Sequence, residues 1–378
     1  MKVLFITAWY PTTENPINGI FIKEHAKSVS IYGNEITVIH AGRANKGIKG
    51  IYGILDTIEE GIRTIRIYCF ASPFRPLNYI LYSLALLLVG RRLFKKGFIP
   101  EIIHAHVYTA GLPALILGRL YGIPIVISEH WSKFPLRKLN VFEKLLAKSV
   151  MNRADMILPV SNSLKVTLCG YGIKGRFKIV PNVVDLSLFY PAEKNQKKHD
   201  DKKILFVGSL KPVKGLPHLF HALSKLGQGR INWHLDMVGE GPAREEYEHL
   251  VTSLGLDHRI KFHGLRTKRE VAEFMRQADF FVLPSLWENL PCVIIEAMAS
   301  GLPVVSTYAG GIPELIDAET GILVPPGDAT RLSEALGLMI DSLDQYDRFA
   351  IARRAQQYSL QVIGKLIHSI YENCILKK

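Results

Sequence analysis

Short runs of β-branched and aromatic residues alternate along the chain with longer stretches in which apolar positions follow a helical spacing. The strand-like runs of the first half are VLFIT (3–7), EITVIHA (35–41), IIHAH (102–106) and IPIVISEH (123–130). Helical stretches, including residues 19–33 and 112–122, separate them. This alternation is typical of a parallel sheet covered by helices on both faces. The pattern therefore predicts an open α/β domain.

The same alternation begins again after a polar segment, AEKNQKKHDDKK at residues 192–203, which has no apolar period. The strand-like runs that follow are ILFVGSL (204–210), WHLDMVG (233–239) and ADFFVLPS (278–285). We therefore predict two Rossmann-like, doubly wound domains, residues 1–190 and residues 191–357. Such a pair predicts a cleft between the domains, lined by loops at the carboxyl ends of the strands.

The composition is that of an ordinary folded protein. Of 378 residues, 48% are hydrophobic and 21% charged, which excludes collagen-like and disordered chains. The four cysteines lie far apart and form no C-x-x-C pair, which argues against a zinc site or a disulfide framework. The amino terminus, MKVLFITAWYPT, lacks the cleavage site of a signal peptide and reads as a first strand. We therefore expect a cytoplasmic location.

The net positive charge of the chain lies in its first half. Residues 1–180 contain 24 Lys and Arg against 10 Asp and Glu, and the remainder contains 23 against 24. In residues 77–97, about thirteen mostly apolar residues run into four cations, a segment that we expect to be too short to span a bilayer. A peripheral membrane contact and a core helix with a solvated basic end both remain open. Nucleic acid is not an expected partner, because no nucleic-acid-binding motif occurs.

The turn VGSLKPVKG, residues 207–215, follows a predicted strand and precedes a helix. Its glycines let the backbone approach a ligand, the helix offers free N–H groups, and Lys214 adds a cation. These features predict a phosphate site, although many strand-to-helix turns contain glycine without one. VGEGP (238–242) is a second glycine turn, but it lacks the spacing of a dinucleotide fingerprint.

Two glutamates flank the start of another predicted helix. In PSLWENLPCVIIEAMA, Glu288 lies in a polar loop, and a helix starts at Pro291, with Glu296 about a turn and a half further on. An elongated ligand such as a nucleotide-sugar could contact both acids and the amides between them. Alternatively, Glu288 is a helix N-terminal acid and Glu296 lies on a solvated face. The apolar flanks of Glu296 make its exposure less favourable.

The run FVLPSLWENLPCVIIEAMASGLPVVSTYAGGIPELI resembles the signature of glycosyltransferase family 4, retaining enzymes of GT-B fold, with its E-x7-E motif at Glu288 and Glu296. The resemblance extends over nearly the whole chain. Further segments similar to the family are YPTTENPINGIFIKEHAKSV, IIHAHVYTAGLPA, ISEHW, IVPNVVDLSLFYP, LFVGSL, MVGEGP, FHGL and TGILVPPGD.

The resemblance implies roles for particular residues. Glu296 binds the ribose of the donor, Glu288 and nearby amides contact the transferred sugar, and Lys214 neutralises the diphosphate. The implied donor-binding residues are Gly19, Ser209, Lys214, Gly239, Glu288, Asn289, Leu290, Pro291 and Glu296. The implied catalytic residues are Glu288, Lys214 and His130. For His130, at the end of a strand, a purely structural role is the alternative.

One position departs from the family. Members often carry Arg directly after the glycine of the VG motif, where this chain has Ser209. Lys211 is close by, but its point charge does not reproduce a bidentate guanidinium. The resemblance also implies that the last helix, about residues 358–378, packs back on the first domain.

These features together predict a retaining glycosyltransferase. Fixed dipoles and cations aimed at a departing diphosphate lower the barrier to transfer, and no D-x-D-like acid cluster calls for a metal. We therefore expect no cofactor. The expected substrate is a nucleotide-sugar. The basic first domain favours a lipid-linked or membrane-surface saccharide acceptor, as in cell-surface polysaccharide biosynthesis. An isomerase like the nucleotide-sugar 2-epimerases and an inactive nucleotide-sugar-binding partner subunit remain alternatives.

Overall fold

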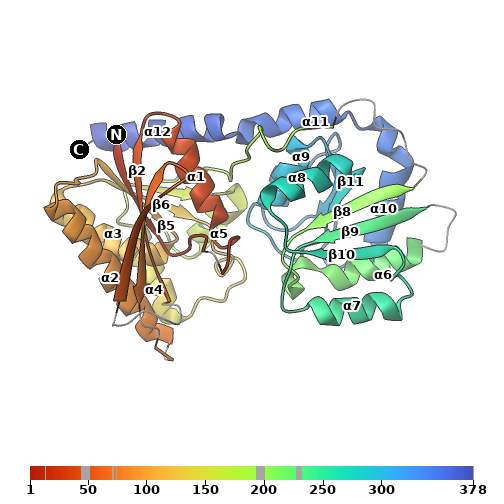
Figure 1. The fold of residues 1–378 in the computed structure, drawn as a ribbon, viewed down its shortest axis with the longest axis horizontal. Coiled ribbons are helices and arrows are strands. Elements are labelled where there is room, and N and C mark those ends of the chain that lie inside the picture. Colours follow the sequence, from red (N-terminus) through yellow and green to blue (C-terminus); the bar gives the residue numbers. More distant parts are fainter. Residues whose placement is uncertain are drawn as a thin grey trace. The chain divides into compact units, whose positions relative to one another are not determined.

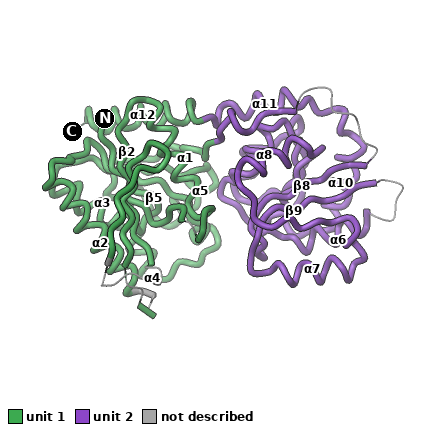
Figure 2. The backbone as a smooth tube through the Cα atoms, viewed as in Figure 1, with its two compact units in different colours: residues 1–183, 360–378 green, residues 184–359 purple. Residues whose placement is uncertain are grey.

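The computed structural model describes residues 1–12, 14–43, 52–69, 72–73, 75–192, 201–226 and 232–377. By its internal packing the chain divides into two compact units (Figure 2). Unit 1 comprises Met1–Val183 and Leu360–Lys378, and unit 2 comprises Val184–Ser359. The polar segment expected near the junction, residues 192–203, lies mostly outside the described residues.

The sheet of unit 1 has seven described strands in the order β3-β4-β2-β1-β5-β6-β7 (Figure 1). Neighbouring strands pair in parallel except β3, which pairs antiparallel with β4 as an edge hairpin that the sequence analysis did not anticipate. The strands are β1 (Lys2–Thr7), β2 (Glu35–Arg43), β3 (Tyr52–Glu59), β4 (Ile62–Cys69), β5 (Ile102–His106), β6 (Ile125–Glu129) and β7 (Met156–Pro159).

Helices cover both faces of this sheet because its strand side chains alternate between two cores. In β1, Leu4 and Ile6 join the core under α2, α3 and α4, whereas Val3 and Phe5 join the core under α1 and α12. The helices of unit 1 are α1 (Ile20–Ser30), α2 (Arg75–Lys95), α3 (Tyr108–Tyr121), α4 (Val141–Met151), α5 (Asn162–Gly170) and α12 (Leu360–Leu376).

The apolar segment of the first half forms most of α2. Within the described residues, one helix, Leu77–Lys95, is long and apolar enough to cross a membrane by length and composition, and 28% of its most apolar window is buried. Our expectation that this segment is too short to span a membrane was therefore wrong by the criteria of length and composition. One side of the helix, including Leu86, Val89 and Leu93, packs into the core of unit 1.

The last helix, α12, belongs to unit 1 and lies against α1. The two helices approach so closely that a Cβ built on Gly364 would lie 2.0 Å from the Ser28 carbonyl oxygen. At the far end of α12, the Tyr371 hydroxyl lies 2.6 Å from Nδ1 of His104 in the sheet. The carboxyl-terminal segment therefore completes one core of unit 1.

The sheet of unit 2 has six described strands, all parallel, in the order β10-β9-β8-β11-β12-β13. β8 and β11 end at Val207 and Leu283, earlier than predicted, because the glycine turn and Pro284 follow them. The strands are β8 (Lys202–Val207), β9 (Trp233–Val238), β10 (Ile260–Gly264), β11 (Phe280–Leu283), β12 (Val304–Thr307) and β13 (Gly321–Val324).

Six α-helices and four 3-10 turns connect and flank the strands of unit 2 in its described part. The α-helices are α6 (Leu216–Leu226), α7 (Arg244–Ser253), α8 (Lys268–Gln277), α9 (Cys292–Ala299), α10 (Ala329–Ser342) and α11 (Arg348–Ala355). The 3-10 turns are η1 (Pro212–Lys214), η2 (Ile312–Glu314), η3 (Leu343–Gln345) and η4 (Gln356–Tyr358).

Gly364→Ala should destabilise the chain by about 1–3 kcal/mol, because the new methyl group cannot fit against the Ser28 carbonyl without moving a helix. The matched control is Gly337→Ala in α10, where the nearest atom to a new Cβ is 3.6 Å away on Leu226. That control should be neutral or gain up to about 1 kcal/mol from helix propensity. Denaturant unfolding measures both, and equal stabilities would contradict the close helix contact.

Candidate active site

In unit 2, β8 lies between β9 and β11, so the strand order reverses direction next to β8. The loops after β8 and β11 leave the same edge of the sheet, next to this reversal, which is where ligands of open α/β sheets bind. The two loops, residues 208–215 and 284–291, are the segments that carry Lys214 and Glu288. The topology therefore brings the two strongest sequence-predicted motifs together.

Lys214 and Glu288 form an ion pair across these loops. Lys214 Nζ lies 2.5 Å from Glu288 Oε1, and Ser285 Oγ donates to the same oxygen at 2.8 Å. The side chains are only 16% and 14% exposed, so the pair is weakly screened by water. The sequence analysis gave these residues separate contacts and did not predict that they touch.

Glycines allow the loops of unit 2 to approach one another. Gly215 has φ +66°, and a Cβ there would lie 2.2 Å from the Pro284 carbonyl oxygen. Gly310 has φ +57°, and a Cβ there would lie 1.6 Å from the Glu288 carbonyl oxygen. A residue with a side chain would be strained at both positions, so glycine fixes the path of the Glu288 loop from both sides.

The two glycine turns at the end of β8 and β9 pack directly on each other. Gly239 has φ +142°, and a Cβ there would lie 1.9 Å from the Gly208 carbonyl oxygen. Ser209 is half-buried, and its carbonyl accepts a bond of 2.9 Å from the N–H of Lys211. The backbone of this turn is therefore closely packed, while the Lys211 side chain is exposed.

Helix α9 starts directly after the Glu288 loop. Pro291 is its N-cap rather than its first residue, and the two residues before it, Asn289 and Leu290, end the loop. Glu296 is buried, with 6% exposure, and its Oε1 lies 3.7 Å from Lys268 Nζ at the start of α8. The solvated-face alternative for Glu296 is therefore excluded. The sequence analysis missed Lys268, because its pairing depends on two helices far apart in the chain.

In unit 1, the corresponding reversal of strand order lies next to β1. The loop after β1 runs to Gly19, which is the N-cap of α1 and has φ +71°. A Cβ on Gly19 would lie 2.8 Å from the Trp9 carbonyl, so the loop folds tightly against its own beginning. A residue with a side chain would be strained at position 19, whereas the donor contact implied for Gly19 stays a prediction.

The turn after β6 is organised by a buried carboxylate. Glu129 accepts bonds from the backbone N–H groups of Tyr108, His130 and Trp131 at 3.0, 2.8 and 2.8 Å. Burial raises the pKa of Glu129 to about 7, against the lowering effect of these three donors. The bonds fix the backbone of His130, whose ring lies 4.3 Å from that of Phe21.

Four histidines gather on one side of the unit 1 sheet. Adjacent rings in this cluster have centroids 4.2 to 6.0 Å apart, and burial lowers the pKa of every member. Its members are His25, His104, His106 and His130. The sequence analysis singled out only His130. The spacing of His104 and His106, two apart in a strand, was a signal that both face one side.

A cavity of about 290 Å³ opens at the carboxyl edge of the unit 1 sheet. Its lining comes from the ends of β1 and β2 and from the starts of α2 and α3. Four of the residues that line it are aromatic: Trp9, Tyr79, Tyr82 and Trp131. The rings of Trp9 and Trp131 meet edge to face at 5.4 Å, so the cavity has rigid apolar walls.

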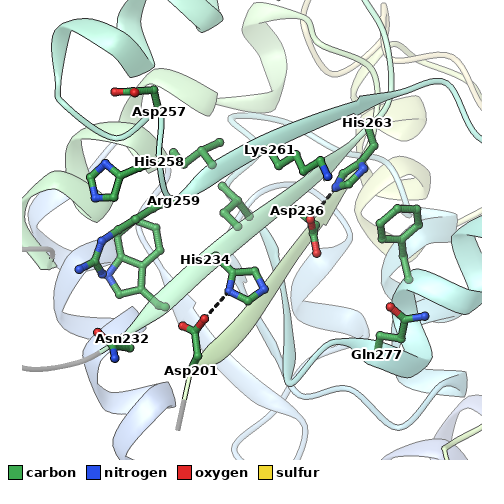
Figure 3. Close-up of a pocket in the computed structure, with 14 residues that line it drawn as sticks. Asp201, Asn232, His234, Asp236, Asp257, His258, Arg259, Lys261, His263 and Gln277 are labelled. Atoms are coloured by element: carbon green, nitrogen blue, oxygen red, sulfur yellow. Dashed lines mark hydrogen bonds and ion pairs between the residues drawn. The ribbon is translucent and has the colours of Figure 1, made fainter. Parts of the chain in front are cut away.

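Another cavity, of about 680 Å³, lies along β9 and β10 of unit 2 (Figure 3). Two His–Asp pairs line it: His234 with Asp201 at 2.9 Å and His263 with Asp236 at 2.5 Å. None of the sequence-predicted site residues lines this groove. It is therefore distinct from the site around Lys214 and Glu288.

Comparison with known protein families covers both units. A family model for glycosyl transferases group 1 matches residues 191–356, and a model for glycosyltransferase family 4 matches residues 21–188. The chain belongs to glycosyltransferase family 4. It is accordingly a glycosyltransferase that uses a nucleotide-sugar donor.

Relatives of this glycosyltransferase carry several activities. A putative teichuronic acid biosynthesis glycosyltransferase, TuaC of Bacillus subtilis, is 27% identical over 89% of this chain and 88% of its own length. A glycogen synthase of Mycobacterium tuberculosis is 25% identical over 98% and 94%. The family match thus leaves the acceptor open.

Solved structures show the same GT-B fold. Sucrose-phosphate synthase from Thermosynechococcus elongatus has a TM-score of 0.82 at 20% identity, covering 100% of this chain and 99% of its own. Anabaena HepE, solved with UDP-glucose, has a TM-score of 0.74 at 21% identity, covering 99% and 100%. The predicted fold class and family are confirmed.

The stability of unit 1 should fall as the pH drops from about 6.5 to 4. Burial lowers the pKa of His40 to about 4, although its bond to the Thr7 carbonyl opposes this. The unfolded chain therefore binds the proton first, and stability present above pH 6.5 is lost on acidification, by about 3 kcal/mol for this residue. Urea unfolding of His40→Gln should show a shallower pH dependence, whereas His249→Gln, exposed on α7, should match the wild type. Parallel curves for wild type and His40→Gln would contradict it.

Proposed function

We propose that this enzyme transfers a hexosyl group from a nucleoside diphosphate sugar to a saccharide acceptor, with retention of configuration and without a metal ion. The acceptor is lipid-linked or held at the cytoplasmic surface of a membrane, and the product enters cell-surface polysaccharide biosynthesis. The observation that carries this proposal is the Lys214–Glu288 pair at the reversal of strand order in unit 2.

A bound diphosphate would compete with Glu288 for Lys214 Nζ, because it brings more negative charge than one carboxylate. Glu288 would then accept hydrogen bonds from hydroxyl groups of the transferred sugar. The backbone amides at the start of α9 would face the diphosphate. Glu296, held by Lys268, would accept bonds from the ribose hydroxyls.

The bond from the anomeric carbon to the diphosphate oxygen breaks as negative charge grows on the leaving group. Once paired with the bound diphosphate, Lys214 would neutralise this charge as it develops. The acceptor hydroxyl forms the new bond on the same face, and its proton passes to the departing phosphate oxygen. His130 would support the sugar as a neutral hydrogen-bonding group, since burial lowers its pKa well below the usual value.

Glu288→Gln and Lys214→Met should each lower transfer by roughly 10²–10³-fold, since each removes a charge aimed at the reacting groups. The matched controls are Glu334→Gln and Lys225→Met, which lie exposed on α10 and α6. NMR time courses with a panel of UDP- and GDP-sugars, membrane lipid extract and no added metal measure the rate and the configuration of the product.

Other outcomes of the same time course would contradict the proposal. Conversion of the donor into a new nucleotide-sugar without acceptor would indicate the isomerase. Saturable donor binding without turnover would indicate an inactive partner subunit and direct attention to Ser209. An inverted product, or dependence on a divalent ion, would overturn the corresponding part of the mechanism.

An exposed apolar face supports the membrane part of the proposal. Helices α2, α3 and α4 share one core and pack side by side, α2 on α3 and α3 on α4. Their outward sides carry large apolar residues that are 37% to 72% exposed. The members of this apolar face are Ile80, Leu84, Leu88, Leu112, Ile116, Leu120, Val141, Phe142 and Leu145. A patch of this kind favours contact with another apolar phase.

A group of cations and the aromatic-lined cavity lie at the two ends of α2, next to this apolar face. Arg91, Arg92, Lys95 and Lys96 are exposed at the end of α2, where they suit anionic headgroups. The aromatic-lined cavity opens at the other end of the same helix. A lipid-linked acceptor could therefore rest its chain on the apolar face and its saccharide near Trp9 and Trp131. The Bacillus relative is named for a role in teichuronic acid biosynthesis.

Replacing Leu84, Leu88 and Leu120 together by Ser should weaken binding to vesicles with anionic lipid at least tenfold, because three exposed apolar side chains are lost. Replacing the four cations of α2 by Gln should weaken binding most at low salt. Vesicle flotation measures both, with Leu338→Ser on α10 as the control. Unchanged binding of both variants would remove the membrane from the proposal.

A further inference from the structure

Three histidine rings from three different elements of unit 1 converge on one point. His25 comes from α1, His106 from the end of β5, and His130 from the turn after β6. One ligating nitrogen of each lies within 4.8 Å of the others. The ring centroids are 5.7, 5.7 and 6.0 Å apart, which is close to an equilateral triangle.

Two of these rings have nitrogens without a described partner. His106 is fully buried, and neither Nδ1 nor Nε2 has a hydrogen bond within the described part of the chain. His25 donates from Nε2 to the Pro181 carbonyl at 3.1 Å, and its Nδ1 has no partner there either. Leaving a buried polar group without a partner destabilises the folded state. An unpaired buried group in a folded protein calls for an explanation, and a bound ion is one such explanation.

The hydrogen bond of His25 fixes the form that a metal ligand requires. A carbonyl oxygen only accepts, so Nε2 carries the proton and Nδ1 presents its lone pair. Histidines that bind metals commonly donate their other N–H to a backbone carbonyl in this way. His104, the fourth ring of the cluster, uses both nitrogens on Tyr371 and Ser128 and is therefore not a ligand.

We propose that His25, His106 and His130 form a binding site for one divalent transition-metal ion of the Zn²⁺ class. Three neutral imidazoles are a preferred ligand set for Zn²⁺, Cu²⁺, Ni²⁺ and Co²⁺. A tetrahedral ion with bonds of about 2.0 Å would hold the three ring centroids about 5.3 Å apart. Each ring would move inward by less than about 1 Å. His130 as a whole residue is half-buried, although its two ring nitrogens are buried, and a water molecule would complete the coordination of the ion.

The metal ion takes no part in the proposed transfer reaction, but its binding would lower the rate of that reaction. His130 would be held by the metal and could no longer turn toward the transferred sugar. Added Zn²⁺ would then lower the rate of transfer. The effect of Zn²⁺ on transfer rests on the proposed function, whereas the metal site does not. A measurement of metal binding therefore tests the site even if the proposed function fails.

The test is titration of the metal-free, full-length, untagged chain with Co²⁺, followed by its visible absorption and by displacement with Zn²⁺. We expect saturation at one ion per chain with the strong bands of tetrahedral Co²⁺. His25→Leu and His106→Leu should each weaken binding at least a hundredfold. His249→Leu, exposed on α7, should bind like the wild type.

Folding of the variants is checked by thermal unfolding, and His25→Gln and His106→Gln replace any Leu variant that does not fold. Absence of saturable one-to-one Co²⁺ binding by the wild type would overturn the site, whatever the variants do. Unchanged affinity in folded variants at both positions would also overturn it.

Discussion

Parallel pairing of strands is the constraint on which the rest of this structure depends. In each unit one strand, β1 or β8, has neighbours that lead the chain in opposite directions. Ligands of open α/β sheets bind at the carboxyl edge beside such a reversal. Residues such as Gly19, Lys214 and Glu288 lie in the loops beside these reversals. Pairing of the backbone thus determines where chemistry is possible before any side chain is considered.

At the carboxyl edges of the two sheets, the following buried or half-buried charged groups have partners. Lys214 pairs with Glu288, Lys268 pairs with Glu296, and Glu129 is bound by three backbone N–H groups. Removing a charge from water without such partners would cost several kcal/mol. The loops that carry Lys214 and Glu288 are therefore held together by these contacts. Glycines at positions 215 and 310 allow this arrangement, because a side chain at either would push the loops apart.

The two faces of the unit 1 sheet have different surroundings. Toward α1 and α12, the sheet carries His104 and His106 in a tightly packed core. Toward α2, α3 and α4, the core is aliphatic, and the outer sides of these helices are again apolar. A helix that is apolar on two sides fits between a core and a second apolar phase. The same alternation of strand side chains produces both environments.

By itself the sequence determined the class of fold and the family, and it pointed to candidate site residues. Periodicity locates most strands because burial on both sheet faces selects β-branched and aromatic residues, and β5 matches its predicted range, 102–106. The antiparallel β3 and its partner β4 were not among the predicted strands, although both contain several apolar residues. The motif spacing identified Glu288 and Glu296, since both lie in one short segment.

Only the tertiary structure decided which residues touch. The contact of Lys214 with Glu288 spans 74 positions, and the pairing of Lys268 with Glu296 joins two helices. The grouping of His25 with His106 and His130 joins one helix to two strand ends. Local patterns record whether a residue is buried and in what element. They do not record its neighbour, because the order of strands in a sheet is set by the packing of the whole unit.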